Sequence, residues 1–310
     1  MKFLLFPLIL CLCLNSFAGE TASNERFTHL SDSITEIPSS LKGSFGDMFN
    51  TESKTLALWG GVILTSSAFY IYDEKIYKHV QKFGRKIGLG NDDHTKAFLR
   101  VGGVALLQGP SDVGSGLYYI GNGWTQFAIA TSFYINGQST NNIRAKKTGI
   151  QIVNSLLSAS IPTQLIKRAT GREDPYRASK YRGRWRFFDK NYDNDISSHD
   201  AVPSGHLMAA TSTFAVIDTN YPEYRSVIRP VGIGLLTLLS FQMVNIGVHW
   251  VSDYPLALLI GYTVGHRVAL NGMSSEDAKK DAAFNWELQP LYASFGNQDR
   301  NYGLMANCHF

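Results

Sequence analysis

A short turn at residues 203–206, with the sequence Pro-Ser-Gly-His, carries groups that can hold and protonate an anion. An apolar segment from Leu207 follows it and predicts a helix, so the turn lies at a helix start. Backbone N–H groups at a helix start lack intrahelical partners, and the helix dipole is positive there, which favours bound phosphate. The turn predicts an anion site in which Ser204 and Gly205 bind and His206 donates a proton, although such a triplet alone is a weak signal.

A second cluster closes a long apolar segment, where His249 and Asp253 are four positions apart. On one helical turn the carboxylate of Asp253 can accept a hydrogen bond from one ring nitrogen of His249 and leave the other ring nitrogen free. An imidazole oriented in this way can attack phosphorus as a nucleophile. Taken alone, the same pair is also compatible with a helix end that these side chains only cap or pack.

A third cluster, residues 167–175, follows an apolar segment that ends near Ile166. Its first residue, Lys167, supplies a cation that can hold phosphate oxygens together with Ser204 and backbone N–H groups. The acidic run at residues 189–200 does not predict a calcium site, because it lacks the regular ligand series and the terminal Glu of a calcium loop. We therefore interpret that run as a solvated loop.

The three clusters together resemble the motifs of the type 2 phosphatidic acid phosphatase family, which also includes bacterial acid phosphatases and vanadium haloperoxidases. Their order in the chain matches, as do the complete Pro-Ser-Gly-His turn, the spacing from His249 to Asp253 and the spacing from Lys167 to Pro175. The resemblance covers roughly residues 97–270. Three motifs in the right order are far more specific than any one of them, so the chain is identified as a member of this family.

The resemblance implies a role for each matched residue. His249 would be the nucleophile that forms a phosphohistidine, Asp253 the carboxylate that orients it, and His206 the general acid. The phosphate ligands would be Lys167, Ser204 and the backbone amide of Gly205. The mechanism of the family needs neither a metal nor another cofactor.

Two departures from the motifs of the family remove its phosphate-binding arginines. Asp174 stands where the first motif has Arg, and Gln242 and Met243 stand where the third motif has Ser and Arg. Each lost bidentate contact to a phosphate dianion costs about 2–4 kcal/mol of transition-state stabilisation. Arg172, two residues before Asp174, is predicted to substitute as a substrate ligand. The alternative is that Arg172 pairs with Asp174 or Glu173 and only stiffens the loop.

These residues predict an envelope phosphatase that hydrolyses a phosphomonoester or a pyrophosphate, with a lipid phosphate as the favoured substrate. The expected partners are a phosphorylated lipid or small phosphoester and membrane lipids, and no nucleic acid. The competing hypothesis is a catalytically impaired member of the family that binds phosphorylated lipid or has a structural role in the envelope. Vanadate-dependent halide oxidation ranks third, because it depends on the missing arginines.

The two ends of the chain are expected to lie outside the helical domain. Residues 1–18 predict an export signal with cleavage after Ala18, and residues 19–50 predict a polar linker or arm. After cleavage only Cys308 of the three cysteines remains, which excludes an internal disulfide. Residues 272–310 predict a C-terminal tail with a small β-like hairpin.

The region 51–271 is predicted to be one all-α domain, a bundle of six to seven helices embedded in a membrane. Its long apolar segments are 56–72, 150–166, 207–217, 227–248 and 256–270. Charged residues make up 17% of the chain and its net charge is +4, a composition typical of a globular rather than a disordered protein. A soluble helical bundle that carries the same site is the alternative.

The order of the apolar segments predicts which face of the membrane the site occupies. If the new N-terminus is exported, the segment 56–72 enters the membrane and the basic stretch 73–100 lies inside. The Gly-rich segment 101–136 is compatible with two short helices or a hairpin, and two short passes there place the basic turn 145–147 inside as well. The helix 150–166 then delivers Lys167 outside. The predicted location is the inner membrane, with the site facing the periplasm.

Overall fold

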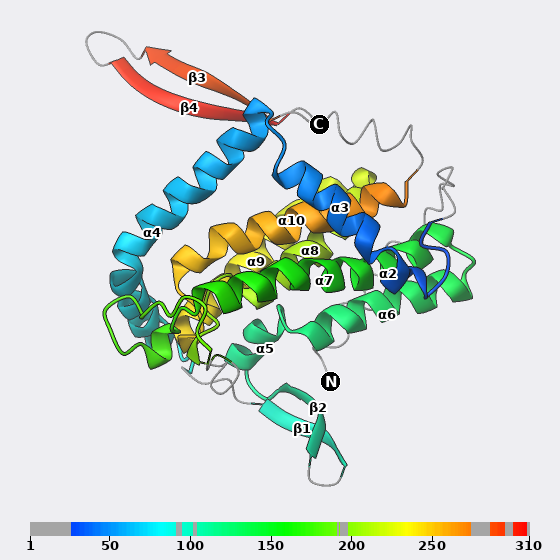
Figure 1. Cartoon of the computed structure of the whole chain (residues 1–310), viewed down its shortest axis with the longest axis horizontal. Helices are drawn as coiled ribbons and strands as arrows, with labels where there is room; N and C mark the ends of the chain where they lie inside the picture. Colours follow the sequence, from blue (N-terminus) through cyan, green and yellow to red (C-terminus); the bar gives the residue numbers. More distant parts are fainter. Residues whose placement is uncertain are drawn as a thin grey trace.

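The computed structural model describes residues 26–90, 95–101, 104–190, 192, 198–273, 286–294 and 300–308. The predicted export signal, residues 1–18, lies outside these ranges, as do Asp193 and Asp195 of the acidic run. The described part of the chain is mostly helical, which confirms the predicted all-α fold (Figure 1). The small C-terminal hairpin is also confirmed, because β3 (Trp286–Ser294) pairs antiparallel with β4 (Arg300–Cys308).

The centre of the bundle consists of α6 (Gly123–Ser139), α7 (Ile143–Thr170), α8 (Gly205–Asn220) and α10 (Tyr254–Asn271). Three of these helices begin at a polar cap, since the side chains of Asn122, Asn142 and Ser204 each accept a hydrogen bond from a first-turn backbone N–H. Such caps satisfy donors that the helix leaves unpaired and determine where it begins. Because Ser204 caps α8, the Pro-Ser-Gly-His turn stands at a helix start, as predicted.

α8 and α10 approach each other closely because α10 presents glycines to α8. A Cβ atom on Gly261 would lie 2.5 Å from the carbonyl oxygen of Met208, and one on Gly265 would lie 2.4 Å from that of Ser212. Neither distance leaves room for a side chain, so the contact requires glycine at both positions. The close packing holds the first turns of α8 and α10 together at one end of the bundle.

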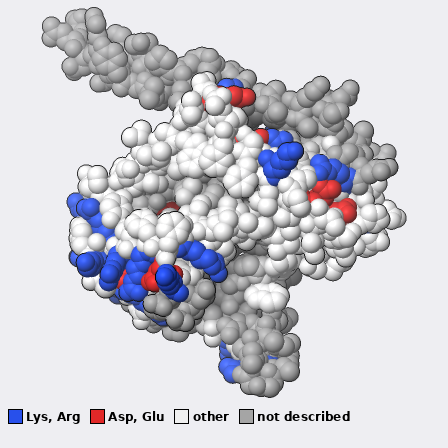
Figure 2. All heavy atoms as spheres, viewed as in Figure 1, with Lys and Arg blue, Asp and Glu red and all other residues white. Residues whose placement is uncertain are grey.

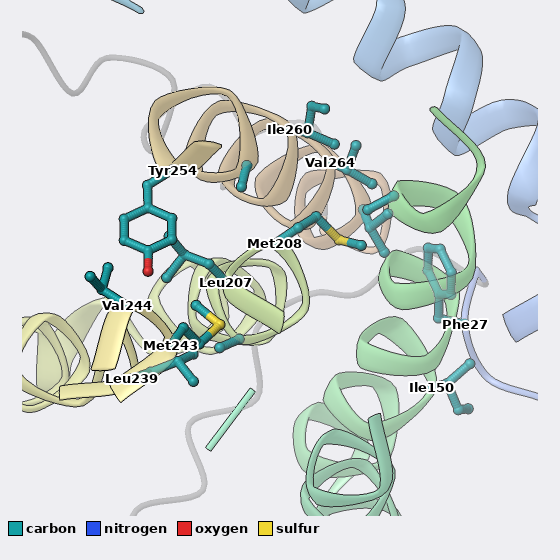
Figure 3. Close-up of a cluster of buried hydrophobic side chains, with 14 residues drawn as sticks. Phe27, Ile150, Leu207, Met208, Leu239, Met243, Val244, Tyr254, Ile260 and Val264 are labelled. Atoms are coloured by element: carbon teal, nitrogen blue, oxygen red, sulfur yellow. The ribbon is translucent and has the colours of Figure 1, made fainter. Parts of the chain in front are cut away.

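The core shown in Figure 3 joins α8, α10 and a further long helix, α9 (Arg225–Ile246). Leu207 and Met208 of α8 share one buried cluster with Leu239 and Met243 of α9, and none of these residues is more than 3% exposed. Full burial of a side chain of this size contributes about 1.5–3 kcal/mol. Met243 is therefore a packing residue at the position where the related family motif has Arg.

Two helices present apolar side chains outward. α4 (Ser53–Lys86) and the segment Pro222–Ile246, which includes α9, are each long and apolar enough to cross a membrane. None of the apolar window of α4 is buried, and Leu64 of α4 is 73% exposed and Ile233 of α9 is 59% exposed. Continuous apolar surface of this kind is favourable against lipid rather than water, which supports association with a membrane.

The segment predicted as a linker or arm, residues 19–50, belongs to the folded bundle from residue 26 onward. It contains α2 (Asp32–Thr35) and α3 (Ile37–Met48), which pack on α7, and α3 also packs on α10. The hydroxyl of Ser40 donates to Oδ1 of Asn154 over 2.8 Å in a buried contact. The prediction of a linker was wrong, because the segment forms two helices that buried polar contacts hold against the bundle.

The Gly-rich region 101–136 does not form two membrane passes. β1 (Thr95–Val101) pairs antiparallel with β2 (Val104–Pro110), and the short α5 (Val113–Tyr119) follows. A helix of 7 residues is roughly 10 Å long, about a third of the hydrocarbon thickness of a bilayer. The region thus combines the two alternatives, since a hairpin at its start is followed by the two helices α5 and α6, and only α6 approaches the length of a membrane pass.

The C-terminal half of α4 lies at the same end of the bundle as the three sequence motifs. Asp73 accepts a hydrogen bond from Arg172 over 2.8 Å, and the ring of Tyr77 lies 5.8 Å from that of Trp250. Lys and Arg side chains gather at one end of the molecule in Figure 2. The predicted topology put the basic stretch 73–100 and the site on opposite faces of the membrane. That step is corrected, because α4 carries its basic half to the site.

Candidate active site

Two glycines in the left-handed region end α7 and α9 and bring the site residues together. Gly171, with φ 52°, ends α7 shortly after Lys167, and Gly247, with φ 81°, ends α9 shortly before His249. A Cβ atom on Gly171 would also lie 2.3 Å from the carbonyl oxygen of Arg186. Glycine adopts this backbone conformation without strain, so Lys167 and His249 meet at the end of the bundle where α8 begins.

His249 is buried, with 4% exposure, and two oxygen atoms determine the orientation of its ring. Its Nδ1 lies 2.8 Å from the carbonyl oxygen of Ala201 and 3.8 Å from Oδ2 of Asp253. Because a carbonyl oxygen only accepts, we assign the proton of the neutral ring to Nδ1 and the lone pair to Nε2, as a nucleophile requires. The pair does not share a regular α-helical turn, since His249 precedes the short η6 (Val251–Asp253).

Asp253 is fully buried and is held from two sides. Its Oδ2 accepts from the backbone N–H of Trp250 over 2.7 Å, and its Oδ1 accepts from Nη1 of Arg172. A carboxylate with both oxygens engaged cannot rotate away from the imidazole next to it. The predicted role of Asp253 in orienting His249 therefore has a structural basis in these further contacts.

Arg172 is the centre of a buried ionic cluster and is 1% exposed. Its guanidinium pairs with Asp73 at 2.8 Å and with Asp253, and its Nη1 donates to the hydroxyl of Ser252 over 2.7 Å. Three aromatic rings lie 5.1–5.3 Å from its central carbon, those of Tyr70, Trp185 and Trp250. Cation–π attraction to these rings adds to the ionic contacts.

These surroundings favour a positioning role for Arg172 over the predicted role as a substrate ligand. Movement of its guanidinium toward phosphate would leave the buried carboxylates of Asp73 and Asp253 without their cation, and breaking a buried ion pair costs about 3–5 kcal/mol. The structure shows Arg172 paired with neither Asp174 nor Glu173, the alternative partners considered from the sequence. Asp73 was missed from the sequence, although a carboxylate directly after an apolar segment is a signal of a buried partner.

Lys167 is 3% exposed, and an acidic neighbour already occupies its ammonium group. Nζ donates to the carbonyl oxygen of Asp200 and lies 3.3 Å from its Oδ2. Gly205 lies beside the same side chain, since a Cβ atom on it would be 3.8 Å from Cε of Lys167. The structure thus brings two predicted phosphate ligands together. Asp200 was assigned to a solvated loop, and nothing in its spacing indicated this contact.

Ser204 is completely buried, and its hydroxyl contacts other parts of the protein. The oxygen accepts from the backbone N–H of Leu207 over 3.4 Å and lies 3.6 Å from Sδ of Met243. Thioether sulfur is a weak acceptor, so the hydroxyl can turn its hydrogen toward a phosphate without losing a strong hydrogen bond. Met243 supplies no charge to the site, as expected from the sequence.

His206 lies in the first turn of α8, with its ring 4.4 Å from the ring of Tyr118. Burial, with the charges of His249 and Lys167 adding to it, lowers the pKa of His206 to about 3. The imidazole is therefore neutral at pH 7 when no anion is bound. A bound phosphate would favour its protonated form, because an adjacent negative charge raises the pKa of a histidine. Substrate binding would thus prepare His206 to act as an acid.

The cluster combines two imidazoles, a buried lysine and the N-terminus of α8. His206 lies within electrostatic range of His249, Lys167 and Asp200. Such a set can bind an anion, attack phosphorus and protonate a leaving oxygen, which is the chemistry of phosphoryl transfer. In the described part of the chain no group of three His, Cys, Asp or Glu residues is arranged to hold a metal ion.

Comparison with known proteins agrees with this chemistry. Residues 148–272 match the family model of the PAP2 superfamily. The matched region runs from α7 to the end of α10 and contains all three motifs. This match confirms the resemblance found in the motifs.

Among solved structures, the chain is similar to one described as the crystal structure of the first transmembrane PAP2 type phosphatidylglycerolphosphate phosphatase from Bacillus subtilis. The sequence identity is 15%, the similarity covers 70% of this chain and 92% of that chain, and the TM-score is 0.43. At this level of similarity, the substrate of that protein does not identify the substrate of this chain. No curated protein sequence matched.

Proposed function

We propose that the protein is a membrane-associated phosphatase that hydrolyses a phosphomonoester or a pyrophosphate, with a lipid phosphate as substrate. The family match supports a phosphatase-type hydrolase. The observation that carries the mechanism is the orientation of His249, whose Nδ1 is held by the carbonyl of Ala201 beside Asp253 and whose Nε2 is left for attack. The exposed apolar faces of α4 and α9 favour a substrate that is drawn from a lipid layer.

In the proposed reaction Nε2 of His249 attacks phosphorus, and the N–P bond forms as the bond from phosphorus to the leaving oxygen breaks. His206, protonated once phosphate is bound, transfers its proton to the leaving oxygen. Charge on the phosphoryl oxygens is stabilised by Lys167, the hydroxyl of Ser204 and the backbone N–H of Gly205. Neutral His206 then takes a proton from water as the water oxygen attacks phosphorus, and the N–P bond to His249 breaks to release inorganic phosphate and the free imidazole.

A second function is favoured by the low positive charge of the site. Lys167 is occupied by Asp200, and Met243 is completely buried and uncharged. A site of this kind could bind a phosphorylated lipid or have a structural role in the envelope without hydrolysing its ligand. Binding in the absence of turnover distinguishes this function from the first.

Phosphate release from a panel of substrates separates the two functions. Full-length protein in detergent is incubated with a lipid pyrophosphate, phosphatidic acid and a soluble phosphomonoester, each with and without EDTA. We expect release from at least one lipid phosphate and no effect of EDTA, because no step of the mechanism uses a metal. Binding without release from any substrate would establish the alternative, and loss of activity in EDTA would contradict the metal-free mechanism.

The course of α4 determines how the site is oriented in the membrane. From Ser53 to Asp73 an α-helix rises roughly 30 Å, which matches the hydrocarbon thickness of a bilayer. Because Asp73 contacts the site, we infer that residue 52 and the site lie on opposite faces. An exported N-terminus and the periplasmic site predicted from the sequence can both hold only if α4 does not cross the membrane.

Cysteine accessibility tests this arrangement. In a background in which Cys11, Cys13 and Cys308 are all replaced by Ser, Glu52→Cys and Tyr181→Cys each place one thiol at an exposed position, before α4 and in the loop beside the site. We expect a membrane-impermeant thiol reagent to label only one of the two variants in intact spheroplasts and both after permeabilisation. Labelling of Tyr181→Cys alone would identify a periplasmic site. Labelling of both variants before permeabilisation would show that α4 does not cross.

A further inference from the structure

Asp174 is a buried acid with an oxygen that the surrounding protein does not engage. It precedes the short η2 (Pro175–Arg177), and its backbone N–H donates to the carbonyl of Ser198 over 3.3 Å. Only 6% of the residue is exposed, and its Oδ1 is buried with no hydrogen-bond partner among the described residues. Buried polar atoms are nearly always paired, so a buried oxygen without a partner indicates a ligand or proton that completes the site.

The charged groups that face Asp174 come from four parts of the chain. They are Lys167 on α7, Arg177 on η2, Asp200 in the loop before α8 and Asp253 at the end of η6. Lys167 donates to Asp200 and Arg177 donates to the hydroxyl of Ser198 over 2.6 Å, and neither cation forms a hydrogen bond with Oδ1 of Asp174. Burial, followed by the negative charge of Asp200, raises the pKa of Asp174 to about 9.

Asp174 therefore lies among the groups of the proposed phosphate site as a neutral acid at pH 7. A carboxylate can only accept hydrogen bonds, whereas a protonated carboxyl group also donates one. A neutral donor beside Lys167 would bind a phosphoryl oxygen, but an ionised Asp174 would repel it. Asp174 thus attracts a bound anion when it is protonated and repels the anion when it is ionised.

We propose that Asp174 is protonated in the working enzyme and donates its O–H to a phosphoryl oxygen of the substrate. The inference rests on the proposed function and narrows the form of the substrate. Protonated Asp174 carries no charge, and part of the positive charge of Lys167 is already balanced by Asp200. The site can therefore neutralise little charge on a ligand, and it suits a phosphate group that carries a single negative charge. Affinity for phosphate should then fall when Asp174 loses its proton.

Binding of inorganic phosphate to full-length protein in detergent, measured by calorimetry at pH 7 and pH 10, tests the proposal. The variants are Asp174→Asn, whose amide donates at every pH, and Asp174→Ala, which has no donor. With a pKa of about 9, the dissociation constant of the wild type relative to that of Asp174→Asn should rise about tenfold between the two pH values. Ionisation of phosphate itself cancels in this ratio. At pH 7 we expect Asp174→Ala to bind about fivefold more weakly than Asp174→Asn.

The matched control is Asp189→Asn, which removes a partly exposed carboxylate of the same polar segment and should leave the ratio unchanged. Equal binding by Asp174→Asn and Asp174→Ala, or a ratio that does not change with pH, would overturn the role of Asp174. Circular dichroism of each variant identifies loss of fold. Phosphate release in the substrate panel is a separate measurement. If inorganic phosphate binds to the variants as predicted but no substrate is hydrolysed, the proposed catalytic function is wrong and the role of Asp174 in binding stands.

Discussion

Replacing His249 by alanine is expected to lower phosphate release about 10⁴-fold or more, the scale on which loss of a nucleophile or of its partner acts in other enzymes. The loss is large because the N–P bond cannot form without the imidazole. Among the described residues of the site, only the His249 ring is oriented by a backbone carbonyl, that of Ala201, so no other residue can replace it. Release from the best substrate of the panel, measured at saturating concentration, checks this expectation.

Two further measurements make the experiment specific. His79→Ala removes an exposed histidine of α4 and serves as the matched control, with unchanged activity expected. Rapid acid-free quenching of wild-type protein with labelled substrate should trap an alkali-stable, acid-labile phosphoprotein that His249→Ala lacks. Full activity of His249→Ala, or a trapped phosphoprotein in that variant, would show that His249 is not the nucleophile.

Replacing Arg172 by methionine is expected to reduce the free energy of unfolding by about 3–5 kcal/mol, because two buried carboxylates lose their cation. Asp73 and Asp253 are both at most 1% exposed, so water cannot solvate the charges that remain. Chemical denaturation of the detergent-solubilised protein, followed by tryptophan fluorescence, measures the change. Activity should fall as well, because Asp253 then loses one of the two contacts that hold it beside His249.

Arg182→Met is the matched control for this experiment. Arg182 also lies over the ring of Tyr70, but its guanidinium donates to the exposed carbonyl of Ile71, and its removal should cost less than about 1 kcal/mol. Adding Asp73→Asn to Arg172→Met should restore part of the stability by removing one unpaired charge. A stable Arg172→Met variant with a raised KM and unchanged kcat would instead identify Arg172 as the substrate ligand predicted from the sequence.

Much of the fold followed from local patterns. The apolar segments after Ser204 and around residues 150–166, 227–248 and 256–270 all became helices, because an apolar run bounded by caps, Gly or Pro has few other stable conformations. The predictions failed where local composition is ambiguous. Residues 26–50 look polar but pack through buried hydrogen bonds, and the Gly-rich region after residue 101 suits a hairpin as well as a short helix.

The sequence by itself determined which residues can carry the chemistry. His206, His249, Lys167 and the turn at Ser204 were all identified from residue type, order and spacing, because those features follow from what phosphate chemistry needs. The departures at Asp174 and Met243 were equally visible. What the sequence could not supply was the set of neighbours that each of these residues has in the folded chain.

The tertiary structure decided those neighbours. Asp73 reaches Arg172 across 99 positions of sequence, and Asp200 reaches Lys167 across 33, so no local spacing marks either contact. Burial then changes the chemistry. An aspartate side chain is ordinarily ionised in water at pH 7, whereas burial in this site raises the pKa of Asp174 to about 9, so it keeps its proton. The physical reason is that charge and hydrogen bonding depend on distance and solvent in three dimensions, whereas the sequence records only order along the chain.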